Sequence, residues 1–284
     1  TSQNDNLNYI NTGKDRDQIT VSGNSHNTIY AGKGKDIVRS GSGNDTINAG
    51  DDDDADELYG GEGYDTYSVN TNDIIKDDDG KGKIYFHRTH HLSGGVETEA
   101  GSKIYKGDNF TYNLNGNTLS VTDDNTGEKI TIKDYDKYRN NGGDLEIKLT
   151  DKIDISIDDV TVEEGDTKNQ IAKVNVSLSR ELKENETIKL YMPNGNTLEF
   201  KAGDQNKTYE YKYDGDYTVN SQKERKTTIS PWKIDSSSNI SASVKKQGSV
   251  TITDDDTPIY ISTKGSTDAE SELAERAQKL EEDL

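Results

Sequence analysis

A nine-residue repeat in the first quarter of the sequence constrains this chain more than any other feature. Six successive rows carry Gly at the second position, Asp or Asn at the sixth and an apolar residue at the eighth. They are TGKDRDQIT (12–20), SGNSHNTIY (22–30), AGKGKDIVR (31–39), SGSGNDTIN (40–48), AGDDDDADELY (49–59, two extra residues) and GGEGYDTYS (60–68), and a degraded copy occupies 3–11. A flexible linker needs neither a fixed period nor a regular apolar position. The repeat therefore indicates ordered structure.

Each row has the composition of a tight turn followed by a short strand. Glycine accepts positive φ, so the first six residues can turn with their carbonyl groups pointing inward, and the Asp adds a carboxylate. The next three residues form a strand whose middle side chain enters a core. One row cannot bury its single apolar residue, so rows must stack. Calcium prefers roughly six to eight oxygen ligands of these kinds in a flexible cage, and the repeat therefore predicts several calcium ions bound between stacked turns.

The charge of the chain fits this prediction. There are 54 Asp and Glu against 34 Lys and Arg, a net charge of −20, and only 28% of the 284 residues are hydrophobic. Such a composition is otherwise typical of disorder, and about four divalent ions would offset about eight of the excess charges. The acidity argues against a nucleic-acid partner, and the sequence holds no transmembrane stretch of about 18 apolar residues. The absence of Cys excludes disulfides and thiolates.

The row GGEGYDTYS resembles the repeats-in-toxin (RTX) nonapeptide GGxGxDxUx of secreted bacterial proteins. The resemblance implies a parallel β-roll over residues 1–70, in which turns two rows apart face each other across a calcium ion. Row by row it pairs Asp36 with Asp56 and Asp45 with Asp65. It also pairs Asp17 with Asp36 and Asn27 with Asp45, although Asp15 and Ser25 stand where the family has a second glycine. The ligand positions that it implies are Asp17, Asn27, Gly32, Gly34, Asp36, Gly41, Gly43, Asp45, Gly50, Asp56, Gly61, Gly63 and Asp65. We expect the Asp51–Asp54 run to be a solvated bulge loop, and an additional source of calcium ligands is the open alternative.

Residues 71–150 lose the period but keep strand patterns. Asn115-Gly116 between two alternating runs predicts a two-residue hairpin. The segment resembles the haemolysin-type calcium-binding related region that follows RTX rows, which implies a β cap over the last row. His87, His90 and His91 lack a fourth ligand and a metal-site spacing, so we expect surface-loop residues. Asp77–Asp79 is expected to be solvated charge.

Residues 151–258 read as seven or eight short strands with turn residues between them, which favours an antiparallel β-sandwich. VTVEEGD (160–166) and SVTITDDDTP (249–258) resemble Calx-β domains and immunoglobulin-like adhesin repeats. That resemblance implies a calcium site formed by Glu164 with Asp254, Asp255 and Asp256, and a solvated turn is the open alternative. Residues 259–284 are expected to be a linker and an amphipathic helix at Thr267–Leu284, since Thr267 and Glu270 form a capping box. The expected fold class is thus all-β, with a short C-terminal helix.

No nucleophile, metalloprotease or nucleotide-binding motif occurs in the sequence, so we expect no enzyme here. We expect part of a larger bacterial exoprotein, with any catalytic domain elsewhere, exported by a type I route. Two hypotheses remain. In the first, the chain is a calcium-induced folding and secretion module of a toxin-like protein. In the second it is a segment of a surface adhesin, in which calcium rigidifies a sandwich that binds a host or cell-surface ligand.

Overall fold

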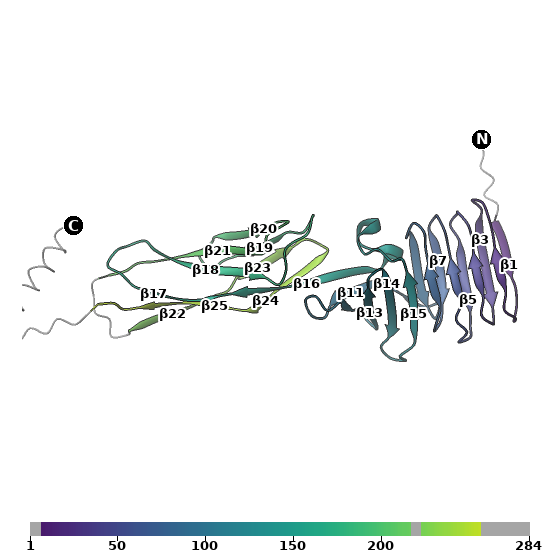
Figure 1. Cartoon of the computed structure of the whole chain (residues 1–284), viewed down its shortest axis with the longest axis horizontal. Coiled ribbons are helices and arrows are strands. Elements are labelled where there is room, and N and C mark those ends of the chain that lie inside the picture. The colour runs from purple at the N-terminus through teal and green to yellow at the C-terminus, as the bar shows by residue number, and fades with distance from the viewer. Residues whose placement is uncertain (1–6, 217–222, 257–284) are drawn as a thin grey trace, which may run out of the picture. The chain divides into compact units, whose positions relative to one another are not determined.

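A computed structural model describes residues 7–216 and 223–256 and shows an all-β protein (Figure 1). Two short 3-10 turns, η1 (Arg139–Asn141) and η2 (Asp144–Glu146), are the helical segments of this part. The expected helix at Thr267–Leu284 lies outside the described residues. Nowhere in the described ranges is there a helix with the length and apolar character needed to cross a membrane.

The repeat rows form a parallel β-roll of two facing sheets, as expected from the sequence. The strands of the first sheet are β1 (Leu7–Asn11), β3 (His26–Gly32), β5 (Thr46–Gly50), β7 (Asp65–Val69) and β9 (Gly82–Phe86). The strands of the second sheet are β2 (Gln18–Thr20), β4 (Ile37–Arg39), β6 (Glu57–Tyr59) and β8 (Ile74–Lys76). Successive rows alternate between the sheets, so each strand pairs in parallel with the strand two rows on (Figure 1).

The core of the roll consists of the eighth residues of the rows. In the first sheet Ile29 pairs with Ile47, which pairs with Tyr67. In the second sheet Val38 pairs with Leu58. All five side chains are fully buried. The period places one apolar residue per row on the inner face, so stacking converts single residues into two continuous apolar ladders.

An antiparallel meander covers the last row of the second sheet. Its strands are β11 (Gly94–Glu97), β12 (Ile104–Lys106), β13 (Phe110–Asn115), β14 (Thr118–Asp123) and β15 (Lys129–Lys133). Strand β15 pairs in parallel with β8, and β10 (His90–His91) pairs antiparallel with β9. The predicted hairpin is confirmed, since Asn115 pairs with Thr118 across Gly116, which has a φ of 61°. These pairings satisfy backbone groups that the last row would otherwise expose.

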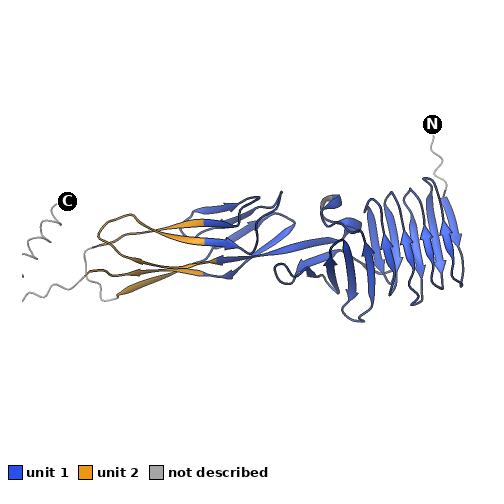
Figure 2. Ribbon diagram, in the orientation of Figure 1, with its two compact units in different colours: residues 1–156, 176–207, 230–247 blue, residues 157–175, 208–229, 248–284 orange. Residues whose placement is uncertain are grey.

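The remaining strands build the sandwich region. They are β16 (Lys148–Ile157), β17 (Asp159–Glu163), β18 (Gln170–Leu178), β19 (Ile188–Tyr191), β20 (Thr197–Phe200), β21 (Asn206–Tyr213), β22 (Glu224–Ile229), β23 (Lys233–Ser236), β24 (Ile240–Lys246) and β25 (Gly248–Thr253). The chain divides into two compact units, residues 1–156, 176–207 and 230–247, and residues 157–175, 208–229 and 248–284 (Figure 2). The domain limits expected at 70, 150 and 258 stay a prediction.

The pairing in this region is mixed rather than purely antiparallel. In the first unit β19 pairs antiparallel with β20 and β23, whereas β24 pairs in parallel with β16. In the second unit β25 lies between β17, to which it is parallel, and β22, to which it is antiparallel. The parallel pairs join strands that are far apart in the sequence. Parallel strands need a long crossover connection and cannot be joined by a short turn.

A buried ion-pair cluster, here called the junction cluster, joins the meander to sandwich strands of the first unit. The Asp151 carboxylate lies 2.5 Å from Lys137 Nζ and accepts a 2.7 Å hydrogen bond from the Tyr105 hydroxyl. Arg180 lies 3.5 Å from Asp151 and donates two hydrogen bonds, of 2.6 and 2.9 Å, to Glu186. Burial acts to raise the pKa of both carboxyl groups, but these donors outweigh it and hold the pKa values of Asp151 and Glu186 below their usual range.

Candidate calcium-binding turns

The sixth residues of the rows form a ladder along one edge of the roll, where each strand of the first sheet leads into the second. The Asp17 backbone N–H donates a 2.7 Å hydrogen bond to Asp36 Oδ1, and the Asp36 N–H donates one of 2.8 Å to Asp56 Oδ1. The Asp56 N–H in turn donates to Asp73 Oδ1 at 3.0 Å. The carboxylates of Asp36, Asp56 and Asp73 are thus each oriented by the turn two rows before them, with one oxygen fixed and the other directed elsewhere.

The opposite edge repeats this arrangement. The Asn27 N–H donates to Asp45 Oδ1 at 2.7 Å, and the Asp45 N–H donates to Asp65 Oδ1 at 2.8 Å. Asn27 uses its side-chain amide as a further donor to Asp45 Oδ1 and to the Ser25 and Ser40 carbonyl oxygens, at 2.8 to 3.0 Å. The structure therefore brings together every pair that the sequence placed two rows apart, although their role as calcium ligands stays a prediction.

The second oxygen of four of these carboxylates is buried and has no hydrogen-bond partner among the described residues. These atoms are Oδ2 of Asp17, Asp36, Asp45 and Asp65. Leaving a buried carboxylate oxygen unpaired is costly. Burial, reinforced by neighbouring carboxylates, raises the pKa of Asp56 and of Asp65 to about 8, and burial raises the pKa of Asp36. A hard cation would be coordinated by the unpaired oxygens and would offset the repulsion among the carboxylates. The residues therefore fit calcium.

The predicted glycines permit the turns to stack at contact distance. A Cβ on Gly50, whose φ is 146°, would lie 1.8 Å from the Gly32 carbonyl oxygen. A Cβ on Gly61, whose φ is 90°, would lie 1.9 Å from the Gly41 carbonyl oxygen. Comparable overlaps, within 3.0 Å of backbone atoms two rows back, would occur at Gly32, Gly34, Gly41, Gly43 and Gly63. Any larger residue would push the carbonyl-lined turns apart, in addition to the strain of positive φ.

Four acidic residues at the turns were missed or misjudged from the sequence. Asp73 continues the first ladder. Asp52 Oδ2 accepts a 2.9 Å hydrogen bond from the Gly34 N–H, so part of the loop that we expected to be solvated contacts a neighbouring turn. Asp77 is buried and accepts a 2.7 Å hydrogen bond from the Tyr67 hydroxyl, and Asp79 accepts one from the Gly63 N–H at 3.3 Å. The expectation of solvated charge is therefore wrong for Asp77 and Asp79, whereas Asp78 is exposed. The signal that could have found Asp73 is the Asp-Ile-Ile sequence at 73–75, a row ending without its glycines.

The acidic residues expected to form a sandwich site are arranged differently from the expectation. In the second unit, single carboxylate oxygens of Asp166, Asp255 and Asp256 lie within 4.8 Å of one another. The Gly165 N–H donates a 3.1 Å hydrogen bond to Asp255. Glu164 is buried and forms an ion pair with Arg225, and the Asp254 side chain accepts a hydrogen bond from the Asp256 N–H. Asp166, which the sequence did not single out, completes the group in place of Glu164 and Asp254.

The histidines lie at the surface, as expected. His87 Nε2 is 2.7 Å from Glu128, and His91 Nε2 is 3.4 Å from Glu146. His90 contacts the Phe110 ring edge-on. Each of the three has a different neighbour, and among the described residues they do not converge on a common metal position.

Comparison with known proteins supports the calcium assignment of the roll. The model of the RTX calcium-binding nonapeptide repeat, which spans four copies, matches residues 21–55 and 52–67. This match covers the turns that carry Asn27, Asp36, Asp45, Asp56 and Asp65, so these rows are RTX-type calcium-binding repeats, and Asp17 and Asp73 lie outside the matched residues. No curated protein and no solved structure matches the chain.

Proposed function

We propose that this chain is a calcium-induced folding module of a larger exported bacterial protein of the RTX type. The observation that carries the proposal is the set of four buried Oδ2 atoms without partners, at Asp17, Asp36, Asp45 and Asp65. A fold with such sites is incomplete without a cation, so metal binding and folding are coupled. The proposal assigns the chain a binding and folding role, with no catalytic step.

The side chains and turns divide the work in this proposal. Backbone N–H groups fix Oδ1 of Asp36, Asp45, Asp56 and Asp65. The glycines hold the turns in contact two rows apart. Bound calcium supplies the positive charge that the turns lack. Before export, at low calcium, repulsion among the carboxylates keeps the rows open. Outside the cell the rows stack, and the meander covers the last one. Because every row contacts only its neighbours, folding should be steeply cooperative in calcium.

Circular dichroism during a calcium titration tests this proposal. We expect only the strand signal of the sandwich region in chelator and a sharp gain on addition of calcium, with magnesium giving much less. Gly50→Ala should fail to gain the signal because of the overlap with Gly32. Gly127→Ala is the matched control, since Gly127 also has a positive φ (79°) but has no neighbouring atom within 4 Å of its Cβ position. A strand signal that is already complete in chelator would contradict the proposal.

The grouping of three carboxylates at Asp166, Asp255 and Asp256, which a second calcium ion could occupy, is the observation that favours the adhesin alternative. In that alternative the ion stiffens the end of the sandwich, which displays a host or cell-surface ligand site. The three carboxylates carry like charge within 4.8 Å of each other, and the pKa of Asp256 is raised by burial and by Asp254 and Asp255. Terbium luminescence compared between the native chain and Asp255→Asn/Asp256→Asn tests the site. Identical titrations would exclude it.

A further inference from the structure

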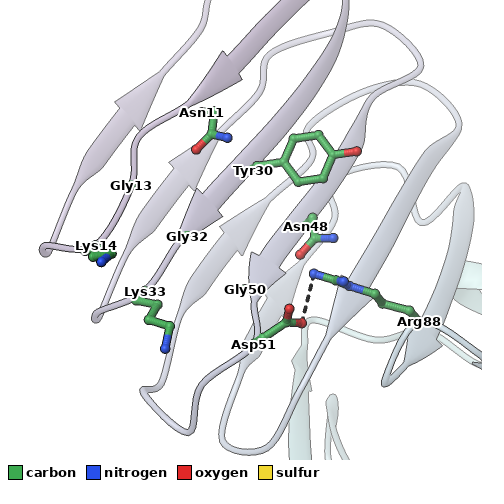
Figure 3. A pocket seen from close by; sticks show the side chains of 10 residues that line it. All are labelled: Asn11, Gly13, Lys14, Tyr30, Gly32, Lys33, Asn48, Gly50, Asp51 and Arg88. Atoms are coloured by element: carbon green, nitrogen blue, oxygen red, sulfur yellow. Dashed lines mark ion pairs between the residues drawn. The ribbon is translucent and has the colours of Figure 1, made fainter.

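A groove runs across the outer face of the first sheet of the roll, on the side away from the core (Figure 3). Its volume is about 250 Å³. The floor is formed by side chains that share one cross-strand line, since Asn11 pairs with Tyr30 and Tyr30 pairs with Asn48. The outward direction of these residues follows from the same alternation that buries their neighbours. Neither the core nor the ladders of carboxylates make use of this face.

Basic residues line the edge of the groove. Lys14 and Lys33 follow Gly13 and Gly32 at equivalent positions of their rows, and both are exposed (Figure 3). Neither lysine makes an ion pair within the described ranges. Asp51 holds the equivalent position two rows on, and its charge is met by Arg88 at 2.8 Å. The groove thus has three cations against one carboxylate, a local excess of positive charge on a chain of net charge −20.

The spacing of these charges restricts the ligand. Neighbouring strands lie about 4.8 Å apart, so cations at equivalent positions of successive turns are spaced more widely than the charges of a DNA duplex. Duplex DNA carries one charge per about 1.7 Å and would meet the repulsion of the whole acidic chain. A ligand with sparse negative charges fits better.

The floor adds a second restriction. Two amides and a phenol can donate to and accept from hydroxyl groups. Tyr30 is 37% exposed, and the Tyr9 ring lies 5.5 Å from the Tyr30 ring, centroid to centroid. An aromatic surface is therefore open to the apolar face of a sugar ring. We propose that this groove binds an acidic glycan, a chain of hydroxyl-rich sugar rings with widely spaced carboxylates, laid across the strands. Lys14 and Lys33 contact the carboxylates, and Asn11, Tyr30 and Asn48 contact the rings.

The groove exists only when the rows are stacked, so this proposal rests on the proposed calcium-dependent folding. Its three floor residues come from β1, β3 and β5, which are separate until the roll forms. The ligand should therefore bind in calcium and not in chelator. Binding measured at saturating calcium, with circular dichroism on the same samples, separates a failure of the groove from a failure of folding.

Isothermal titration calorimetry with a hyaluronan octasaccharide, at saturating and matched calcium, tests the inference. We expect binding to the native chain and a loss of roughly tenfold or more in Lys14→Ala/Lys33→Ala, because charge-assisted contacts are removed. The control is Lys129→Ala/Lys173→Ala, which removes two exposed lysines outside the groove and should bind as the native chain does. All variants should show the same calcium-induced circular dichroism.

Four outcomes would overturn the inference. The first is no binding of the octasaccharide to a chain that circular dichroism shows to be folded. The second is an equal loss in the groove variant and its control, which would indicate a nonspecific charge effect. The third is equal binding of an oligoglutamate peptide, which would show that the floor does not recognise sugar rings. An uncharged maltooctaose should bind much more weakly than the octasaccharide, and equal binding would remove the role of the lysines.

Discussion

The edges of the roll and the junction cluster both bury carboxylates, but they satisfy them in opposite ways. Asp151 is 2% exposed and Asp65 is fully buried. Asp151 has Lys137 within 2.5 Å and a hydroxyl donor, and its pKa is lowered. Asp65 has a backbone donor for one oxygen and none for the other, with further carboxylates nearby, and its pKa is raised to about 8.

This contrast shows why the stability of one part of an acidic protein depends on calcium and that of another part does not. A buried carboxylate with its own Lys or Arg is balanced as soon as the chain folds. A buried carboxylate without one depends on a cation from solution. The sandwich strands of the first unit can therefore be stable without calcium, whereas the roll should respond to it.

The largest effect is expected from Asp151→Ala, which removes the carboxylate from the junction cluster. Lys137 and Arg180 would be left without this partner, and breaking a buried pair in this way costs about 3–5 kcal/mol. Urea unfolding in calcium should show this loss, and the roll's calcium midpoint should change little. A loss below about 1 kcal/mol would mean that the cluster behaves as a surface pair.

A smaller effect is expected from Asp65→Asn, which should stabilise the roll in chelator and weaken its response to calcium. In chelator the variant removes a buried unpaired charge while keeping the acceptor for the Asp45 N–H, so the apo roll should gain on the order of 1–3 kcal/mol. In calcium it should raise the midpoint of the titration, because a ligand has lost its charge. Asp151→Asn is the control and should destabilise the protein under both conditions. If Asp65→Asn destabilised the roll both in chelator and in calcium, the proposed difference between the roll and the junction cluster would be contradicted.

The two regions should also respond oppositely to pH. In the apo roll the folded pKa of Asp56 and Asp65, about 8, exceeds the usual 3.8, so the folded state binds protons more tightly. The stability of the apo roll should therefore fall as pH rises from about 4 to 8. The lowered pKa of Asp151 gives stability that is present above 3.8 and lost as pH falls through the folded value. Strand signal in chelator from about pH 8 to 4 measures the first effect, and urea midpoints from about pH 4 down through the lowered pKa of Asp151 measure the second. Saturating calcium should abolish the slope of the roll.

The smallest effect is expected at an exposed pair. Lys76 Nζ lies 2.8 Å from Asp134, and both side chains are at least 37% exposed. Asp134→Asn should leave the stability almost unchanged, with or without calcium, because water screens the charges. This variant calibrates the comparison, since it shares the ion-pair geometry of the junction cluster but not its burial. A loss comparable with that of Asp151→Ala would show that burial is not the deciding variable.

The period made the roll predictable from the sequence. A repeat fixes both the inward residue of each row and the rows that face each other, so Asp36 could be placed beside Asp56 without coordinates. Asp73 escaped because its row has lost its glycines and the hydrogen bond from Asp56 spans only 17 residues. Asp77 escaped because a run of three Asp has the pattern of solvated charge, whereas its burial depends on Tyr67.

The sandwich was less predictable because its contacts are not periodic. Asp166 joins Asp255 only after strands separated by most of this region have paired. Lys137, Asp151 and Arg180 meet through the packing of the meander against sandwich strands, for which the sequence contains no local signal. Short alternating runs predicted the strands here but not the parallel pairs β16–β24 and β17–β25.

The alternation of rows between the two sheets sets a parity rule for the length of the roll. Hydrogen-bonded partners on one edge are 19, 20 and 17 residues apart, two rows in each case. Insertion of a single row would move every later strand to the opposite sheet, and β8 would no longer meet β15. Insertion of two rows, about 18 residues, would return the chain to the same edge with its register intact. Natural or engineered variants of this roll should therefore grow and shrink in even numbers of rows.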